Sequence, residues 1–305
     1  MHLVSFPYLF VALSIALGHT PAATAQLVAE QCAEGTGVPN EDVLACTRAM
    51  FFVGSSPLKT ATLLSARGRA LQVLGKPRQA LRDHEAALAA NPLSAEAHLG
   101  RALARTDLDD RAGAERDLHK ALALFPHFEA AWSALGRLRF LNRDNAGAIQ
   151  ALNHAIELGG HKGEVFVFRG LTSFRQRNFT AALADFSHAG SLLLGYRNLA
   201  LWQWLAARHA GVPAAGSAQL TLQDLDADEW PAALLAVYLG QREPDTLLID
   251  QDTNIKGPQR QLNGEMMFYL AQYDLLQGNT VSAAARFQRA AKLTGNSSVE
   301  RAMLP

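Results

Sequence analysis

The chain contains few of the residue patterns on which catalytic and metal sites depend. Its 305 residues include two cysteines, and none of its ten histidines belongs to an H-E-x-x-H motif. It also lacks a C-x-x-C pair and a serine within G-x-S-x-G, the patterns that supply zinc ligands or an activated nucleophile. We therefore expect no metal, no other cofactor and no enzymatic activity.

An excess of charge of either sign is also lacking. Lys and Arg together number 28, and Asp and Glu together also number 28. A protein that binds nucleic acid needs a basic surface, and no strong cluster of basic residues is apparent along the chain. We therefore expect no nucleic acid partner. The chain is 49% hydrophobic, which is sufficient for an extensive packed core.

Two short segments resemble ligand-binding loops, but each lacks an essential residue. Residues 211–216 have the glycine spacing of a phosphate-binding loop, yet Ser217 stands where its lysine should be. The acidic residues at 224, 226 and 228 resemble a calcium loop, yet Glu229 replaces the glycine that allows the sharp turn. We interpret the acidic segment as a solvated turn that precedes a helix near Trp230.

The apolar segment at the N-terminus, residues 3–17, is shorter than the about 20 residues that a membrane-spanning helix needs. It is uncharged, and it leads into Ala23-Thr24-Ala25, a small-residue pattern typical of a cleavage site. We predict a signal peptide over residues 1–25, cleaved after Ala25, and hence a periplasmic or secreted protein without stable membrane insertion. Because no Lys or Arg precedes the apolar residues, retention of this segment as an anchor stays open.

Both cysteines, Cys32 and Cys46, follow the predicted cleavage site closely. In an exported protein this placement favours a disulfide, and closure of a loop of about 15 residues would contribute about 3 kcal/mol. Two buried free thiols are the alternative. We interpret residues 26–60 as an N-terminal cap, with one helix running from about Val43 to Val53.

The chain does contain an internal repeat. Alanine occupies two positions seven residues apart in four segments that recur every 34 residues, and again in a fifth segment further on. On a helix, this spacing places both alanines on one stripe, where a neighbouring helix can approach closely. The pairs are Ala80 and Ala87, Ala114 and Ala121, Ala148 and Ala155, Ala182 and Ala189, and Ala283 and Ala290.

Other positions follow the same period. A small residue precedes the first alanine of each of the first four pairs by twelve positions, and Pro92 and Pro126 stand where a helix must end. The small residues are Gly68, Ala102, Gly136 and Gly170. This 34-residue pattern resembles the tetratricopeptide repeat, a helix-turn-helix unit.

The resemblance to tetratricopeptide repeat (TPR) proteins implies an all-α fold. It would be a right-handed superhelix, or α-solenoid, of helix-turn-helix repeats with irregular N-terminal and C-terminal caps. We expect four repeats in residues 61–196, degenerate helical repeats and a loop in residues 197–263, and a further repeat-like unit with a tail in residues 264–305. From Leu199 the frame is expected to shift by two residues. His84 occupies a packing position of the first repeat, so we expect it to be buried or half-buried.

The first helices of such repeats line a concave groove that binds protein partners. The side chains expected there suit an amphipathic helix or an extended peptide, with arginine and aromatic anchors. They are Arg69, Leu103, Arg137, Phe140, Val167, Leu171, Phe174 and Arg175. For each residue, the alternative is ordinary packing against a neighbouring helix or against a C-terminal segment that folds back into the groove.

The C-terminal third, residues 228–302, resembles the NlpI-type envelope lipoproteins of gram-negative bacteria. The resemblance rests on Trp230, Tyr238-Leu239-Gly240, Phe268-Tyr269-Leu270-Ala271, Leu276-Gln277-Gly278-Asn279 and Val299-Glu300-Arg301. It implies a non-catalytic adaptor that binds peptidoglycan hydrolases and a processing protease, and that forms homodimers. The chain departs from that family in lacking a lipidation cysteine. A self-associating structural solenoid, or a small-ligand protein that uses residues 212–259, remain the alternatives.

Overall fold

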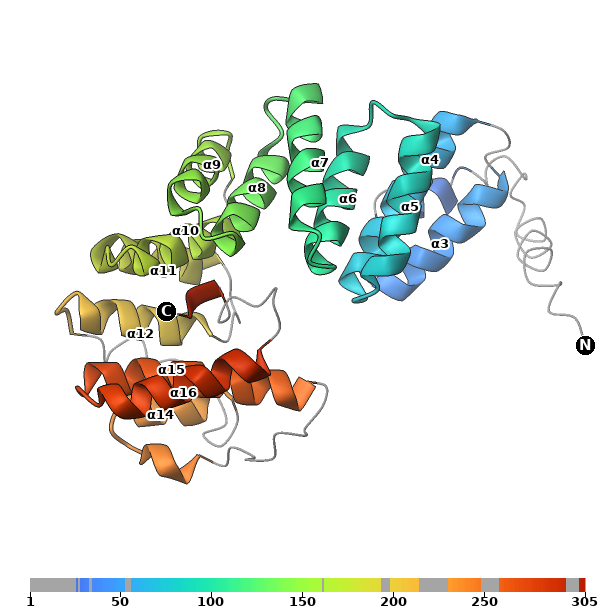
Figure 1. The fold of residues 1–305 in the computed structure, drawn as a ribbon. Coiled ribbons are helices and arrows are strands. Elements are labelled where there is room, and N and C mark those ends of the chain that lie inside the picture. Colours follow the sequence, from blue (N-terminus) through green and yellow to red (C-terminus); the bar gives the residue numbers. More distant parts are fainter. Residues whose placement is uncertain are drawn as a thin grey trace, which may run out of the picture. The chain divides into compact units, whose positions relative to one another are not determined.

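The computed structural model describes residues 26, 28–32, 35–52, 56–160, 162–192, 198–213, 230–247, 258–294 and 302–304. These residues form helices and turns, with no strand among them (Figure 1). The predicted signal peptide and the acidic segment 224–229 lie outside the described residues. Among the helices that are described, none combines the length and the apolar character that crossing a membrane requires. The chain divides into two compact units, residues 1–134 and 135–305, here the N-terminal unit and the C-terminal unit.

The N-terminal unit contains the cap helix and the first two repeats. Its helices are α3 (Pro39–Phe52), α4 (Pro57–Val73), α5 (Pro77–Ala90), α6 (Ala95–Asp107), α7 (Arg111–Leu124) and the beginning of α8 (Glu129–Leu141). Each helix from α3 to α6 packs against the next one along the chain, and α4 also contacts α6. Thus α4 and α5 form the first repeat, and α6 and α7 form the second. Helix α4 begins at Pro57, earlier than the expected Ala61.

A disulfide joins Cys32 to Cys46 in the N-terminal cap, as the sequence predicts, with the two Cα atoms 4.6 Å apart. Both cysteines are buried in a small core that includes Leu63 of α4. The bond therefore fastens the chain before α3 to the buried face of α3, which in turn packs on α4. The cap helix begins at Pro39 rather than at Val43.

The repeated alanines and glycines lie where helices touch. All ten alanines of the five pairs are fully buried. At the small position, a Cβ atom on Gly68, Gly136 or Gly170 would lie 2.5–2.7 Å from the side chain of the residue sixteen positions later. Those later residues are His84, Leu152 and Phe186. The two helices of the first, third and fourth repeats thus meet at a glycine, which explains why a small residue recurs at this position.

A residue in the left-handed conformation follows the first helix of each repeat. Its φ angle lies between 62° and 72° at Gly75, Asp109, Arg143, Arg177 and Gly211, which are 34 residues apart. A shift of frame by two residues was expected from Leu199, but the turn residue Gly211, which follows the helix Leu199–His209, keeps the 34-residue period. Gly211, which has the spacing of a phosphate loop, is a turn residue of the repeat, and Ser217 lies outside the described residues.

The C-terminal unit continues the repeats and adds irregular elements. After α8 come α9 (Asn145–Glu157), α10 (Gly163–Arg175), α11 (Phe179–Leu192), α12 (Leu199–His209), α14 (Ala232–Tyr238), the 3-10 helix η1 (Pro244–Thr246), α15 (Pro258–Leu276) and α16 (Thr280–Leu293). Helices α10 and α11 form the fourth repeat, and α15 and α16 form the last (Figure 1). Helix α12 contacts α11, α14 and α15, so it joins these two repeats.

An aromatic core fills the C-terminal unit. The indole of Trp202 lies 5.3–6.0 Å from the ring centroids of Phe174, Phe186, Phe268 and Tyr269. Every residue of α14 is buried. The degenerate region 197–263 therefore contributes to the core through α12 and α14. Large rings packed edge to face stabilise such a core beyond the burial of their area.

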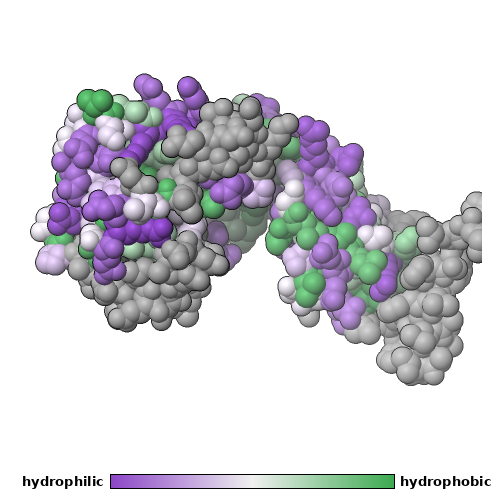
Figure 2. All heavy atoms as spheres, turned by 90° about the horizontal axis from the view of Figure 1, so that it is seen from below, coloured by the Kyte–Doolittle hydropathy of each residue, from purple (hydrophilic) through white to green (hydrophobic). Residues whose placement is uncertain are grey.

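Apolar side chains also reach the surface, but as scattered residues. Phe51, Val73, Leu93 and Val281 are 70–85% exposed and belong to different helices or turns. On the face shown in Figure 2, hydrophobic side chains lie among hydrophilic ones. Single exposed apolar residues are normal in soluble proteins, so they do not by themselves define a partner site.

Candidate partner-binding surface

The predicted groove residues differ widely in exposure. In the N-terminal unit, Arg69 of α4 is exposed and Leu103 of α6 is half-buried. In α8, Arg137 is half-buried, and its guanidinium carbon lies 5.8 Å from the ring centroid of Phe168. These three side chains keep surface that a partner could touch.

The other predicted groove residues lie on α8 and α10 in the C-terminal unit. Four of them are 0–6% exposed and belong to its core, namely Phe140, Val167, Leu171 and Phe174. The phenyl ring of Phe174, for example, packs within 5.6 Å of the rings of Phe179, Trp202 and His209. For these four residues the structure shows the packing alternative, so partner contact would have to come from neighbouring groups.

Arg175 is the predicted groove residue with the richest set of contacts. Its Nε donates a hydrogen bond of 2.6 Å to Oδ1 of Asn145, and its Nη1 donates to the carbonyl oxygen of Phe140 over 3.0 Å. The guanidinium also lies 4.4 Å from the ring centroid of Phe140. Burial, and to a smaller extent the charge of Arg143, lowers the pKa of Arg175 to about 10. The side chain therefore stays positively charged near neutral pH.

Residues 302–304, here the C-terminal segment, fold back onto this same surface. Nη1 of Arg175 donates a hydrogen bond of 3.2 Å to the carbonyl oxygen of Ala302. Nη2 of Arg143 donates one of 2.6 Å to the carbonyl oxygen of Leu304. Ala302, Met303 and Leu304 are 6–8% exposed. Arg175, a predicted groove residue, and Arg143, which lies outside the predicted set, thus hold the backbone of a peptide segment.

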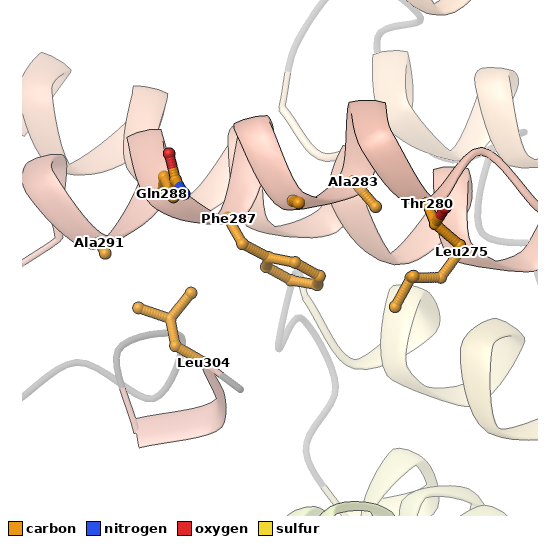
Figure 3. A pocket seen from close by; sticks show the side chains of 8 residues that line it. Leu275, Thr280, Ala283, Phe287, Gln288, Ala291 and Leu304 are labelled. Carbon is orange, nitrogen blue, oxygen red and sulfur yellow. The ribbon is translucent and has the colours of Figure 1, made fainter.

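An apolar pocket of about 480 Å³ lies beside the C-terminal segment. Helix α16 contributes Ala283, Phe287 and Ala291 to its lining, and Leu275 of α15 and Leu304 contribute too. Figure 3 shows Leu304 pointing toward α16, next to Phe287 and Ala291. The segment leaves this pocket open, so there is room for a further apolar side chain.

Charged pairs that recur with the repeat were not among the predicted site residues. Arg67 and Asp83, Arg101 and Asp117, and Arg169 and Asp185 form two-pronged ion pairs with shortest N–O distances of 2.6–2.7 Å. Their common separation of sixteen residues, repeated in the 34-residue frame, is the signal that could have found them. In the third repeat both positions are apolar, Leu135 and Ala151. The pairs therefore belong to the packing of the first, second and fourth repeats, and Leu135 and Ala151 show that two apolar residues can take their place.

The part of the chain that the structure describes contains no group of three or more His, Cys, Asp or Glu side chains placed to hold a metal ion.

Arg143, like the ion pairs, was not among the predicted site residues. It lies in the turn between α8 and α9, and its contact joins residues 161 positions apart. No local pattern in the sequence carries information on such a contact.

Comparison with known proteins agrees with the repeat architecture. A family model described as tetratricopeptide repeat matches residues 65–110, which include parts of the first and second repeats. No curated protein matches the chain.

Solved structures with this fold cover most of the chain. PilF of Pseudomonas aeruginosa aligns with a TM-score of 0.56 at 16% identity, over 72% of this chain and 96% of its own. A tetratricopeptide repeat protein of Parabacteroides merdae aligns with a TM-score of 0.50 at 16% identity, over 92% of this chain and 97% of its own. PilW, described as a widely conserved type IV pilus biogenesis factor, aligns with a TM-score of 0.50 at 15% identity, over 76% of this chain and 92% of its own.

The predicted fold class is thus confirmed: the chain is an all-α solenoid of tetratricopeptide-type helix-turn-helix repeats. Such folds serve generally as scaffolds for protein–protein interaction. At these identities the solved structures establish the fold alone. The resemblance of the C-terminal third to NlpI-type lipoproteins stays a prediction.

Proposed function

We propose that the protein is a non-catalytic scaffold that binds a peptide or short helix of a partner protein on its C-terminal unit. The binding surface is the one where the C-terminal segment now lies. The observation that carries this proposal is the pair of hydrogen bonds from Arg143 and Arg175 to main-chain carbonyl oxygens of that segment. The chain itself thus provides an example of the ligand.

The chemistry of these contacts suits the end of a helix. Ala302 and Met303 are helical, and the last carbonyl groups of a helix have no partner within it. Positively charged donors satisfy such carbonyl groups and also interact favourably with the helix dipole. A partner segment would be held by its backbone and by apolar side chains placed like those of Met303 and Leu304. The open pocket next to Phe287 would accept one more apolar side chain.

We further propose that the mature protein acts in the periplasm or is secreted, after cleavage following Ala25. The apolar segment 3–17 and the small residues after it support this location. The resemblance of residues 228–302 to envelope adaptors favours a peptidoglycan hydrolase or a processing protease as partner, and a homodimer as the assembled form. Cell fractionation, cross-linking in cells with mass spectrometry, and light scattering after size exclusion would test location, partner and assembly in turn.

The binding surface is tested with the chain shortened by deletion of residues 302–305. A fluorescent synthetic peptide with the sequence of residues 299–305 is titrated into this protein, and anisotropy is measured. We expect saturable binding to the shortened protein and weaker binding to the full chain, because the tethered segment competes. Loss of a charged hydrogen-bond donor costs about 1.5–3 kcal/mol, so Arg175→Met should weaken binding by at least about tenfold.

The matched control is Arg177→Met, which removes an exposed arginine from the turn after the same helix. It should leave peptide affinity unchanged. Circular dichroism must show the same helix content in all these proteins. Absence of binding to a folded, shortened protein, or equal losses from both substitutions, would contradict the proposal.

A further inference from the structure

A basic pocket of about 680 Å³ lies in the N-terminal unit. Its residues precede in sequence those of the surface around Arg143 and Arg175. Helices α6 and α7 form the pocket. Its charged and titratable lining groups are His98, Arg101 and Arg105 of α6 and Arg116, Asp117, His119 and Lys120 of α7. Four full positive charges therefore face the single negative charge of Asp117, even with both histidines neutral.

Asp117 organises the inner wall of this pocket. It is 2% exposed and accepts hydrogen bonds of 2.6 and 2.9 Å from Arg101, and one of 2.7 Å from Nη1 of Arg105. Nδ1 of His98 lies 3.3 Å from the same carboxylate. Burial acts to raise the pKa of Asp117, but the arginines outweigh it and the pKa is lowered. The carboxylate is therefore ionised. It binds two arginines, Arg101 and Arg105, with a single negative charge, so a net positive charge remains.

The other repeats provide an internal comparison. The corresponding positions in the first repeat hold Leu64, Arg67, Leu71, Arg82, Glu85 and Ala86, and those in the fourth hold Phe166, Arg169, Ser173, Ala184, Ser187 and His188. The first repeat keeps its ion pair with Asp83 and has Arg82 as its one additional Lys or Arg, and the fourth keeps its ion pair with Asp185 and has no additional Lys or Arg at these positions. In these two repeats the ion pair thus forms without the positive charge that surrounds Asp117.

Among the added groups, Arg105 also has a packing role. Its Nη1 donates to the carbonyl oxygen of Gly113, and Arg139 of the third repeat makes the same bond to Gly147. Arg116, His119 and Lys120 of α7 are instead exposed. Acidic groups near the pocket are Glu85, Asp110 and Glu115, of which Asp110 lies 3.5 Å from Arg105 and Glu115 lies 3.9 Å from His119. None of these three lines the pocket.

We propose that this pocket binds an acidic segment of a partner protein through its Asp or Glu carboxylates. Arg116 and Lys120 are four residues apart on α7, which places them one turn and about 6 Å apart along the helix axis. This spacing suits successive carboxylates along a peptide, and arginine matches the planar carboxylate with paired donors. The inference goes beyond the proposed function, because it concerns another surface of the chain and recognition by charge.

The test uses the full chain and a fluorescent peptide of alternating Glu and Ser residues, with anisotropy as readout. The same peptide with Gln in place of Glu is the ligand control. We expect saturable binding of the Glu peptide that weakens with added salt and little binding of the Gln peptide. Arg116→Glu with Lys120→Glu should reduce affinity at least about tenfold, since it reverses two contacts with charged groups.

Arg82→Glu is the matched control variant, because Arg82 is exposed and occupies the position of Arg116 in the first repeat. It should retain the affinity of the unsubstituted protein. The proposal is overturned if the Glu and Gln peptides bind alike or not at all, or if the control variant loses as much affinity as the double variant. It is also overturned if inorganic pyrophosphate binds and the Glu peptide does not, because the pocket would then be a phosphate site. Binding of the 299–305 peptide to the shortened protein is measured separately, so failure of one proposal leaves the other standing.

Discussion

Replacement of His84 by leucine should make the stability of the N-terminal unit much less dependent on pH. His84 lies on α5 and is fully buried, and its ring occupies the space beside two glycines of the first helices, Gly68 and Gly100. Its Nε2 lies 3.4 Å from Oε1 of Gln72, whereas Nδ1 has no hydrogen-bond partner among the described residues. A protonated imidazole would be poorly solvated in this position.

The size of the effect follows from the pKa of His84. Burial lowers this pKa from 6.5 to about 4; the charge of Asp83 opposes the change, and those of Arg69 and Arg101 add to it. As the pH falls between these values, the unfolded chain binds a proton that the folded chain does not, so the free energy of unfolding falls. At about 1.4 kcal/mol for each pKa unit, the folded protein should lose about 3 kcal/mol by about pH 4.

Urea unfolding followed by circular dichroism, at about pH 7.5 and about pH 4.5, measures this loss. Amide hydrogen exchange in α5 reports on the same region locally. Leucine is the matched substitute because Leu118 and Leu152 occupy the same position in the second and third repeats. Between about pH 7.5 and about pH 4.5, the free energy of unfolding of the unsubstituted protein should fall by most of about 3 kcal/mol more than that of His84→Leu. A difference in unfolding free energy that is the same at both pH values would refute the reasoning.

Three further predictions concern packing, charge and backbone conformation. Gly100→Ala places a methyl group in the ring of His84; we expect it to lower the free energy of unfolding by about 1–3 kcal/mol, and His84→Ala in the same chain should recover part of this in urea titrations. Asp83→Ala leaves Arg67 without its buried partner and should cost about 2 kcal/mol, whereas Arg67→Leu with Asp83→Ala, which copies Leu135 and Ala151, should cost less in a double-mutant cycle. Arg177→Gly relieves a positive φ angle of 62° and should raise stability by about 1 kcal/mol, seen as a higher Tm; an unchanged or lower Tm would contradict this.

The sequence predicts the repeats well because their contacts are local in the frame. Close packing of the helices requires a small residue at each contact, alanine at the paired positions and glycine where α4 approaches α5. These small residues recur every 34 residues and can be recognised in the sequence. The burial of His84 and the disulfide between Cys32 and Cys46 were predicted for similar reasons. Each follows from a position in the repeat or from a short separation in the chain.

The candidate site depends on contacts that the repeat pattern does not encode. For each groove position the sequence left open whether the side chain contacts a partner or packs within the protein; Phe140 and Leu171 are buried in one core with residues of α10, α12 and the C-terminal segment. Arg143 holds Leu304 across 161 positions of sequence, and nothing local to either residue indicates this. The basic pocket was missed for a related reason, since its charges come from two helices and are diluted by acidic residues in the linear sequence.

The C-terminal segment belongs to the same polypeptide as the arginines that hold it, and this sets a condition on any ligand of that surface. A tethered occupant acts at an effective concentration, typically about millimolar when a short connection allows it to reach its site. A free partner segment would have to bind with a dissociation constant well below its own concentration to displace it, and its apparent affinity would fall by the fraction of molecules in which the site is open. Partners joined to the scaffold at a second point, such as an acidic segment held elsewhere on the chain, would gain the same kind of local concentration and meet that condition more readily than partners with a single contact.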